Sequence, residues 1–321
     1  MNQERKKLGF ELMLDNLKTN FGWMMVTNLI FALPLLISIL VAYVLCVYVL
    51  PIVPITLPLA IIFASPFYSG VVALSREFSQ GKKPDKLFRT YFDAVKENGL
   101  KFLLGGFLCY LAYLVCYFSV AVYISLAAEN WFFYLLMFIS ILICFFFLFL
   151  FYAAPLMTVS FDLKLKDIYK NSALMTFGEL KYNFFATFSI LAYLAVVLMP
   201  IIVIFYSSSV FPAIIVKVLL VVYIALSLSL LIPAPCAMMI SNYLYPRMLD
   251  VIADDGAPVE MKTSSDSAKT VSEPIDVSNE PEIDLEELRK GDGEEYIFYQ
   301  GKMIKRKTLL EKMEVKNNEE S

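Results

Sequence analysis

Residues 21–50 read FGWMMVTNLIFALPLLISILVAYVLCVYVL and contain no Asp, Glu, Lys or Arg. A helix needs roughly 20 apolar residues to cross the hydrocarbon core of a bilayer, so this stretch is long enough to span a membrane. Five similar runs follow, at 55–75, 102–128, 130–161, 184–206 and 211–246, the last interrupted only by Lys217. The sequence therefore predicts an all-α, polytopic membrane protein with six transmembrane helices.

The basic residues are distributed unevenly between the predicted loops. Apart from Lys217, all of the 27 Lys and Arg residues lie in residues 1–20, 76–101, 162–183 or after Tyr245. The loops on the other side of the predicted membrane contain no Lys or Arg. Because cytoplasmic loops are enriched in these residues, we expect a multi-pass protein of the cell membrane with both termini in the cytoplasm.

A short motif, Lys-x-Asn, precedes the first, third and fifth predicted helices. Its three copies are Lys18 with Asn20, Lys96 with Asn98, and Lys181 with Asn183. Apolar residues recur ten, seven, six and three positions before the first two Asn residues, and less strongly before the third. This spacing is typical of one face of an α-helix, so an amphipathic helix is expected before each of these spans.

The second, fourth and sixth predicted helices each carry a small residue followed by proline near the basic loops, at Pro66, Pro155 and Pro235. Together with the Lys-x-Asn motif, these pairs predict three parallel repeats, each an amphipathic helix followed by a transmembrane hairpin. The repeats cover about residues 8–75, 86–160 and 171–246 of a transmembrane domain at 1–249.

Both motifs have a structural and a functional interpretation. The Asn can cap a helix or act as a hinge, while the Lys extends its ammonium group toward an anionic leaflet. Alternatively, the three copies converge on a binding site that faces the cytoplasm. The prolines can kink helices and allow close packing, or they can form part of a gate.

The composition argues against catalysis. The chain contains no histidine, which is the commonest general base and metal ligand. The apolar runs contain no carboxylate of the kind that proton relays and ion-coupled carriers use. Lys217 is expected to extend its side chain out of the membrane, with a buried partner or a ligand carboxylate as the alternative. We therefore expect that the chain is not an enzyme and that it has no catalytic residue, no cofactor and no metal site.

The residues after 249 differ in composition from the rest. Residues 250–283 are rich in Ser, Asp, Glu and Pro, which predicts a disordered linker. Residues 284–321 form a predicted cytoplasmic tail with a short helix at 284–290 and a β-hairpin. Since an isolated hairpin is only marginally stable in water, we expect it to bind a partner, the helical bundle or the membrane, with disorder as the alternative. The candidate partner-binding residues are Tyr296, Ile297, Phe298, Tyr299 and Gly301.

Several short motifs resemble a known family. They are NLIFALP at 28–34, residues 66–78 followed by Gly81, Leu87-Phe88, Phe92, Lys96-Glu97-Asn98, and KNSAL at 170–174. They are similar to motifs of the YesL-like bacterial membrane proteins, over about residues 8–250. The resemblance implies a multi-helix protein of undefined activity, often encoded beside genes for carbohydrate uptake and breakdown.

Two function classes remain. The first is an accessory or scaffold protein that contacts a cytoplasmic or membrane protein and the lipid bilayer, but no nucleic acid. The second is a transporter or channel for an uncharged or amphiphilic solute, with polar groups from Asn28, Thr56, Ser189 and Ser227. A hydrated, polar-lined cavity that reaches the middle of the membrane would favour the second class. The sequence does not determine the oligomeric state.

Overall fold

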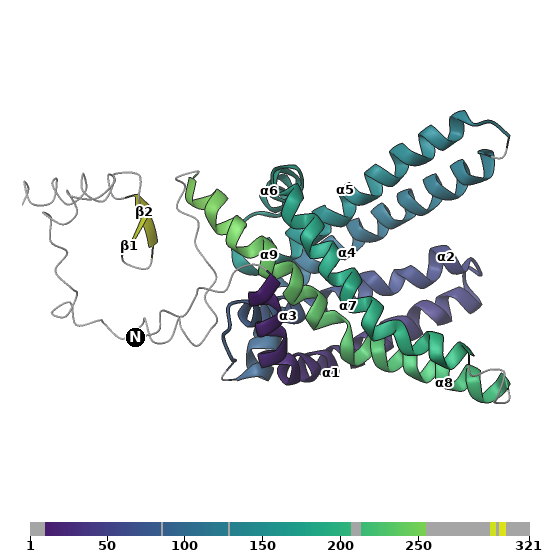
Figure 1. The fold of residues 1–321 in the computed structure, drawn as a ribbon, viewed down its shortest axis with the longest axis horizontal. Coiled ribbons are helices and arrows are strands. Elements are labelled where there is room, and N and C mark those ends of the chain that lie inside the picture. Colours follow the sequence, from purple (N-terminus) through teal and green to yellow (C-terminus); the bar gives the residue numbers. More distant parts are fainter. Residues whose placement is uncertain are drawn as a thin grey trace, which may run out of the picture. The chain divides into compact units, whose positions relative to one another are not determined.

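The computed structural model describes residues 10–84, 86–127, 129–206 and 213–254, and two strands at 296–299 and 302–305. The helical segments, shown in Figure 1, are α1 (Phe10–Tyr48), α2 (Val53–Thr56), η1 (Leu57–Leu59), α3 (Ala60–Ser79), α4 (Leu87–Leu126), α5 (Phe132–Ser160), α6 (Leu165–Gly178), α7 (Leu180–Tyr206), α8 (Ala213–Leu226), η3 (Ser227–Leu231) and α9 (Pro233–Asp254).

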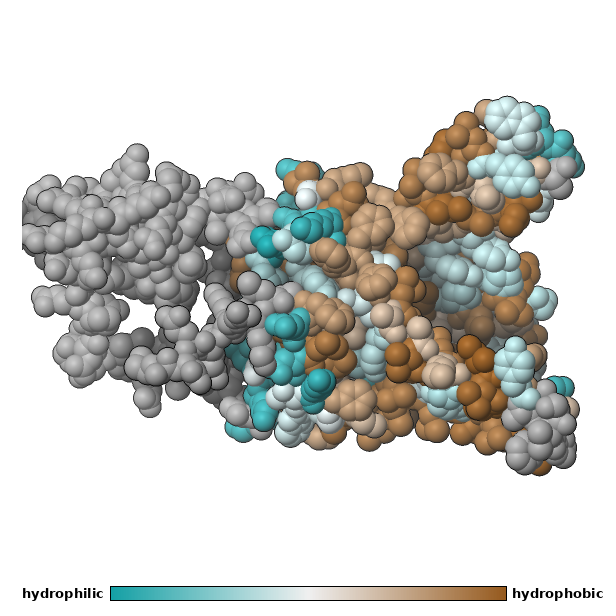
Figure 2. Space-filling model, viewed as in Figure 1, coloured by the Kyte–Doolittle hydropathy of each residue, from teal (hydrophilic) through white to brown (hydrophobic). Residues whose placement is uncertain are grey.

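Six of the described helical segments are long and apolar enough to cross a membrane. They are Phe10–Tyr48, Val53–Ser79, Leu87–Leu126, Phe132–Ser160, Leu180–Tyr206 and Ala213–Leu231. The prediction of an all-α polytopic protein with six transmembrane helices is confirmed. Figure 2 shows that hydrophobic side chains cover much of these helices, whereas a soluble protein rarely exposes so large an apolar surface.

The start of each predicted repeat is helical, but the helices are divided differently from the prediction. In the first two copies the expected amphipathic segment and the span after it form one continuous helix, α1 or α4. In the third copy they are separate, because α6 ends at Gly178 and α7 begins at Leu180. Figure 1 shows the α1–α2 and α4–α5 connections at the same end of the helical unit as the last turn of α7 and the first turn of α8. The repeat itself stays a prediction.

The last predicted helix, residues 211–246, is interrupted in the structure. Its first part is α8, which continues into the short π-helical segment η3, and α9 then begins at Pro233. Proline has no backbone N–H to donate, so Pro233 and Pro235 cannot maintain a regular hydrogen-bond ladder here. α9 also continues to Asp254, so the first residues of the predicted linker are helical.

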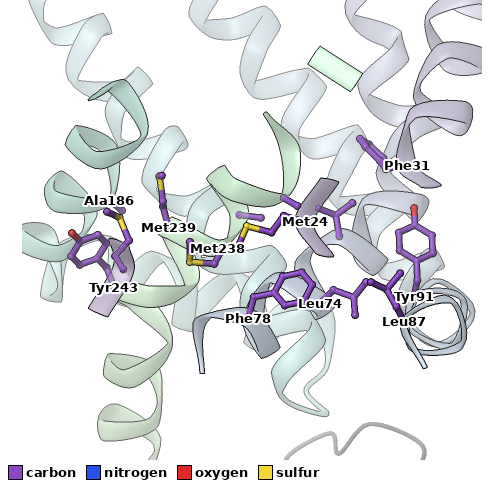
Figure 3. Close-up of a cluster of buried hydrophobic side chains, with 14 of the residues drawn as sticks. Met24, Phe31, Leu74, Phe78, Leu87, Tyr91, Ala186, Met238, Met239 and Tyr243 are labelled. Carbon is purple, nitrogen blue, oxygen red and sulfur yellow. The ribbon is translucent and has the colours of Figure 1, made fainter. Parts of the chain in front are cut away.

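A cluster of buried side chains joins α1, α3, α4, α7 and α9 (Figure 3). Met24, Phe78 and Met238 are fully buried in it. Helices α3 and α4 approach closely at Gly70, where an added Cβ would lie 2.6 Å from the ring of Tyr91. The hydroxyl of Tyr91 donates a hydrogen bond to the carbonyl of Phe67 at 2.8 Å.

The chain divides into two units, and the strands belong to the second, which contains residues 263–321. Strand β1 (Tyr296–Tyr299) pairs antiparallel with β2 (Lys302–Lys305), with Tyr299 opposite Lys302. These are the strands of the predicted hairpin. Gly301, the predicted helix at 284–290 and residues 255–283 of the predicted linker lie outside the described residues.

Candidate functional site

A cavity of about 320 Å³ lies among α1, α3, α4, α5 and α6. Most of its wall is apolar and includes Phe31, Leu35, Ile61, Phe102 and Phe151. Its volume is near the lower end of the range for small-molecule sites, roughly 300–1,000 Å³.

Small residues leave the space for this cavity. Gly105 and Gly106 of α4, Ala64 of α3 and Ala154 of α5 all line it. An added Cβ at Gly106 would overlap the side chain of Ser65, so this glycine permits the close approach of α3 and α4. An added Cβ at Gly105 would lie 3.0 Å from the hydroxyl of Tyr169, so α6 also packs tightly against α4.

Among the residues that the structure describes, Lys101 is the only charged one that lines the cavity. Its Nζ donates a hydrogen bond to the carbonyl of Leu163 at 2.9 Å and lies 3.5 Å from Oδ1 of Asp162. The Asp162 side chain is 66% exposed, and ion pairs with such exposed partners are weak. Lys101 can therefore exchange this carboxylate for another anion.

Four residues with hydroxyl groups accompany Lys101 on the cavity wall: Ser65, Tyr68, Thr158 and Tyr169. Ser65 and Thr158 donate their protons to carbonyls of their own helices, at 2.8 and 2.7 Å. The Tyr169 hydroxyl has no hydrogen-bond partner among the described residues. Burial raises the pKa of this hydroxyl to about 12, so it stays a neutral donor at physiological pH.

The three Lys-x-Asn motifs do not converge on the cavity. Their lysines are exposed and their asparagines are buried, and none of these six residues is among its lining residues. We call the end of the helical unit where Lys18, Lys96, Lys101 and Lys181 lie the basic end. Of the predicted prolines, Pro155 lines the cavity, whereas Pro66 and Pro235 do not.

The asparagines of the motif do not cap the helices in which they lie. Asn20, Asn98 and Asn183 are inside α1, α4 and α7, and they donate to backbone carbonyls. Asn20 donates to Phe78 at 3.4 Å and Asn183 to Met175 at 3.3 Å, in the last turns of α3 and α6 respectively. The predicted capping role is thus wrong for their own helices. The two side chains each add a hydrogen bond to a carbonyl near the C-terminal end of a neighbouring helix, and these carbonyls also accept from the backbone N–H groups of Gly81 and Glu179.

Three of the four polar residues proposed for a solute site form hydrogen bonds elsewhere in the helical unit. Asn28 donates from Nδ2 to the carbonyl of Leu230 at 2.7 Å and accepts at Oδ1 from the N–H of Ala234 at 2.8 Å. Thr56 donates to Leu50, and Ser189 pairs with Tyr243. Neither these residues nor Ser227 line the cavity. Sequence reasoning named Asn28 but missed its role, since nothing in α1 reveals a contact with η3.

Lys217 is exposed on α8, about one turn after this helix begins at Ala213. A lysine at this position can extend its ammonium group toward the end of the helix and out of the hydrocarbon. The position fits the snorkelling interpretation better than a buried ion pair.

No family model, no curated protein and no solved structure matches the chain significantly. The resemblance to the YesL-like family therefore stays a prediction from short motifs. The six apolar helices define the class: this chain is an integral, multi-pass membrane protein.

Proposed function

We propose that the chain is a non-enzymatic accessory or scaffold protein of the cell membrane, with both termini in the cytoplasm. It acts by contact of its basic end and its C-terminal tail with a cytoplasmic or membrane protein. The resemblance to the YesL-like family suggests carbohydrate uptake as the process to examine first.

The observation that carries this proposal is the separation of charge from the bundle interior. Lys18, Lys96 and Lys181 are exposed at the basic end, whereas the apolar runs contain no carboxylate. Carriers that couple transport to protons or ions generally use intramembrane carboxylates. With this distribution of charge, the polar and charged side chains lie at the basic end, where a cytoplasmic partner could contact them.

A transporter or channel for an amphiphilic solute is the second candidate, and the cavity is the observation that favours it. Its wall is mainly apolar, with polar groups from Lys101, Thr158 and Tyr169. A hydrated solute such as a sugar would leave its hydroxyl groups unpaired against such a wall, which costs free energy. Only solutes with a large apolar part fit this alternative.

The test compares the full chain with a variant that lacks residues 251–321. Both are expressed in native membranes, crosslinked and purified, and the captured proteins are identified. We expect both chains to insert and the full chain alone to capture a defined partner. Substitutions Ile297→Asp and Phe298→Asp, in β1, are expected to reduce capture as the deletion does.

The same purified chain is then placed in sealed vesicles with labelled amphiphiles and sugars outside. The accessory function predicts no saturable uptake. Saturable uptake by the chain alone would overturn the proposal in favour of the transporter.

A further inference from the structure

We propose that the cavity among α1, α3, α4, α5 and α6 binds a single-chain amphiphile with an anionic carboxylate headgroup, taken from the leaflet at the basic end. The headgroup contacts Lys101 and Tyr169, and the chain extends along α4 toward Cys109. This binding site is additional to the proposed accessory function and does not depend on it.

The arrangement of polar and apolar groups matches an amphiphile. Thr158 lies two residues before α5 ends at Ser160, and Lys101 contacts Leu163 just beyond that end. The wall then continues through Phe102 to Cys109, eight positions or about 12 Å along α4. Lys101 and Thr158 thus lie at the basic end of the cavity, and the hydroxyl of Tyr169 lies near Gly105, about one turn further along α4. The rest of the wall is mainly apolar, apart from Ser65 beside Gly106 and Tyr68.

The charge at the polar end selects an anion. Lys101 supplies an ammonium group whose present carboxylate partner, Asp162, is largely exposed and 3.5 Å away. The Tyr169 hydroxyl adds a neutral donor that no described residue engages. Hydrogen bonds from a cation to a carboxylate are stronger than those between neutral groups, so a fatty acid carboxylate is favoured over the matching alcohol.

The size of the cavity selects one chain. A volume of about 320 Å³ is small for a ligand site, and the approach of α3 to α4 at Gly106 closes one wall. A phospholipid with two acyl chains would have to leave one chain outside. The apolar wall takes the place of the lipid tails that surround a single chain in the leaflet.

The experiment uses the full chain in vesicles of zwitterionic phospholipid and a photoreactive fatty acid that carries a diazirine near the end of its chain. After irradiation, the labelled residues are identified by mass spectrometry. We expect saturable labelling at residues 102–109 of α4 and 151–155 of α5. Dodecanoate is expected to compete at concentrations about tenfold lower than dodecanol.

Two kinds of variant test the contacts of the ligand's headgroup and of its alkyl chain separately. Lys101→Met and Tyr169→Phe are expected to reduce the advantage of dodecanoate over dodecanol, while labelling by the chain persists. Cys109→Phe places a ring in the cavity and is expected to abolish saturable labelling by the photoreactive fatty acid. Lys96→Met, a neighbouring exposed lysine, and Cys46→Phe, a partly buried cysteine outside the cavity, serve as matched controls.

Three outcomes would overturn the site. The labelling does not saturate, it maps to the lipid-facing surface, or it is unchanged in a folded Cys109→Phe variant. Equal competition by dodecanoate and dodecanol would overturn the anionic specificity. Because the uptake assay measures movement across the membrane, its outcome is independent of whether the cavity is occupied.

Discussion

At the scale of single residues, the structure depends on side chains that satisfy backbone groups inside the membrane. There is no water in the hydrocarbon core to replace a lost hydrogen bond. Asn28 bonds both to the carbonyl of Leu230 and to the N–H of Ala234, on the two sides of the break between η3 and α9. The Tyr193 hydroxyl donates to Leu231 at 2.8 Å in the same break.

Replacement of Asn28 by Leu removes both hydrogen bonds and leaves a buried carbonyl and a buried N–H without partners. We expect a loss of roughly 2 kcal/mol in the free energy of unfolding. The measurement is thermal or detergent-induced unfolding of the purified protein. The same substitution at Asn130, an exposed residue in the turn before α5, is the control. Equal stability of the two variants would contradict this role of Asn28.

Close packing gives a second prediction at this scale. Substitution Gly70→Ala would place a methyl group 2.6 Å from the ring of Tyr91, which cannot yield without moving α4. Overpacking of this kind costs roughly 1–3 kcal/mol. Gly99→Ala is the matched control, since its Cβ would lie 3.7 Å from Pro66. We expect Gly70→Ala to unfold at a lower temperature than Gly99→Ala, and the reverse order would refute the contact.

At the scale of helices, the sequence predicts the features that depend on the length and polarity of a segment. It does not predict the features that depend on contacts between distant segments. The six spans follow from apolar runs that are longer than the membrane is thick. The break at η3 was not predicted, because the run from Phe211 to Pro246 is interrupted only by Lys217 and membrane helices often tolerate proline. The cavity was not predicted either, because it arises where small residues from separate helices, such as Ala64, Gly105 and Ala154, come together.

Helix α6 gives a prediction at the scale of an element. Its Leu174 and Phe177 are 62% and 72% exposed, whereas Ile168 and Met175 are buried in the helical unit. An amphipathic helix with an exposed apolar face lies in the membrane interface. In a variant without native cysteines, Leu174→Cys and Phe177→Cys should react slowly with a water-soluble maleimide, and Lys170→Cys rapidly. Fast labelling at all three positions would place α6 in water.

At the scale of the whole molecule, the orientation in the membrane is a prediction that rests on charge and not on packing. The helices fix which loops share a side of the membrane, but the fold itself would be compatible with either orientation. The Lys and Arg residues at the basic end distinguish the two orientations, because loops rich in these residues remain in the cytoplasm.

Reporter fusions test this orientation. Fusions at Pro51, Glu129 and Ser208 should report an external location, and fusions at Gly81, Lys166 and Asp266 a cytoplasmic one. The first group falls in predicted loops without Lys or Arg, Gly81 and Lys166 fall in predicted loops that contain these residues, and Asp266 falls in the predicted linker. A single reversed reporter would contradict the six-span topology, because it would require an even number of crossings between two neighbouring sites that one span should separate. Complete reversal of all six would keep the fold and refute the charge argument, so the two parts of the prediction can fail separately.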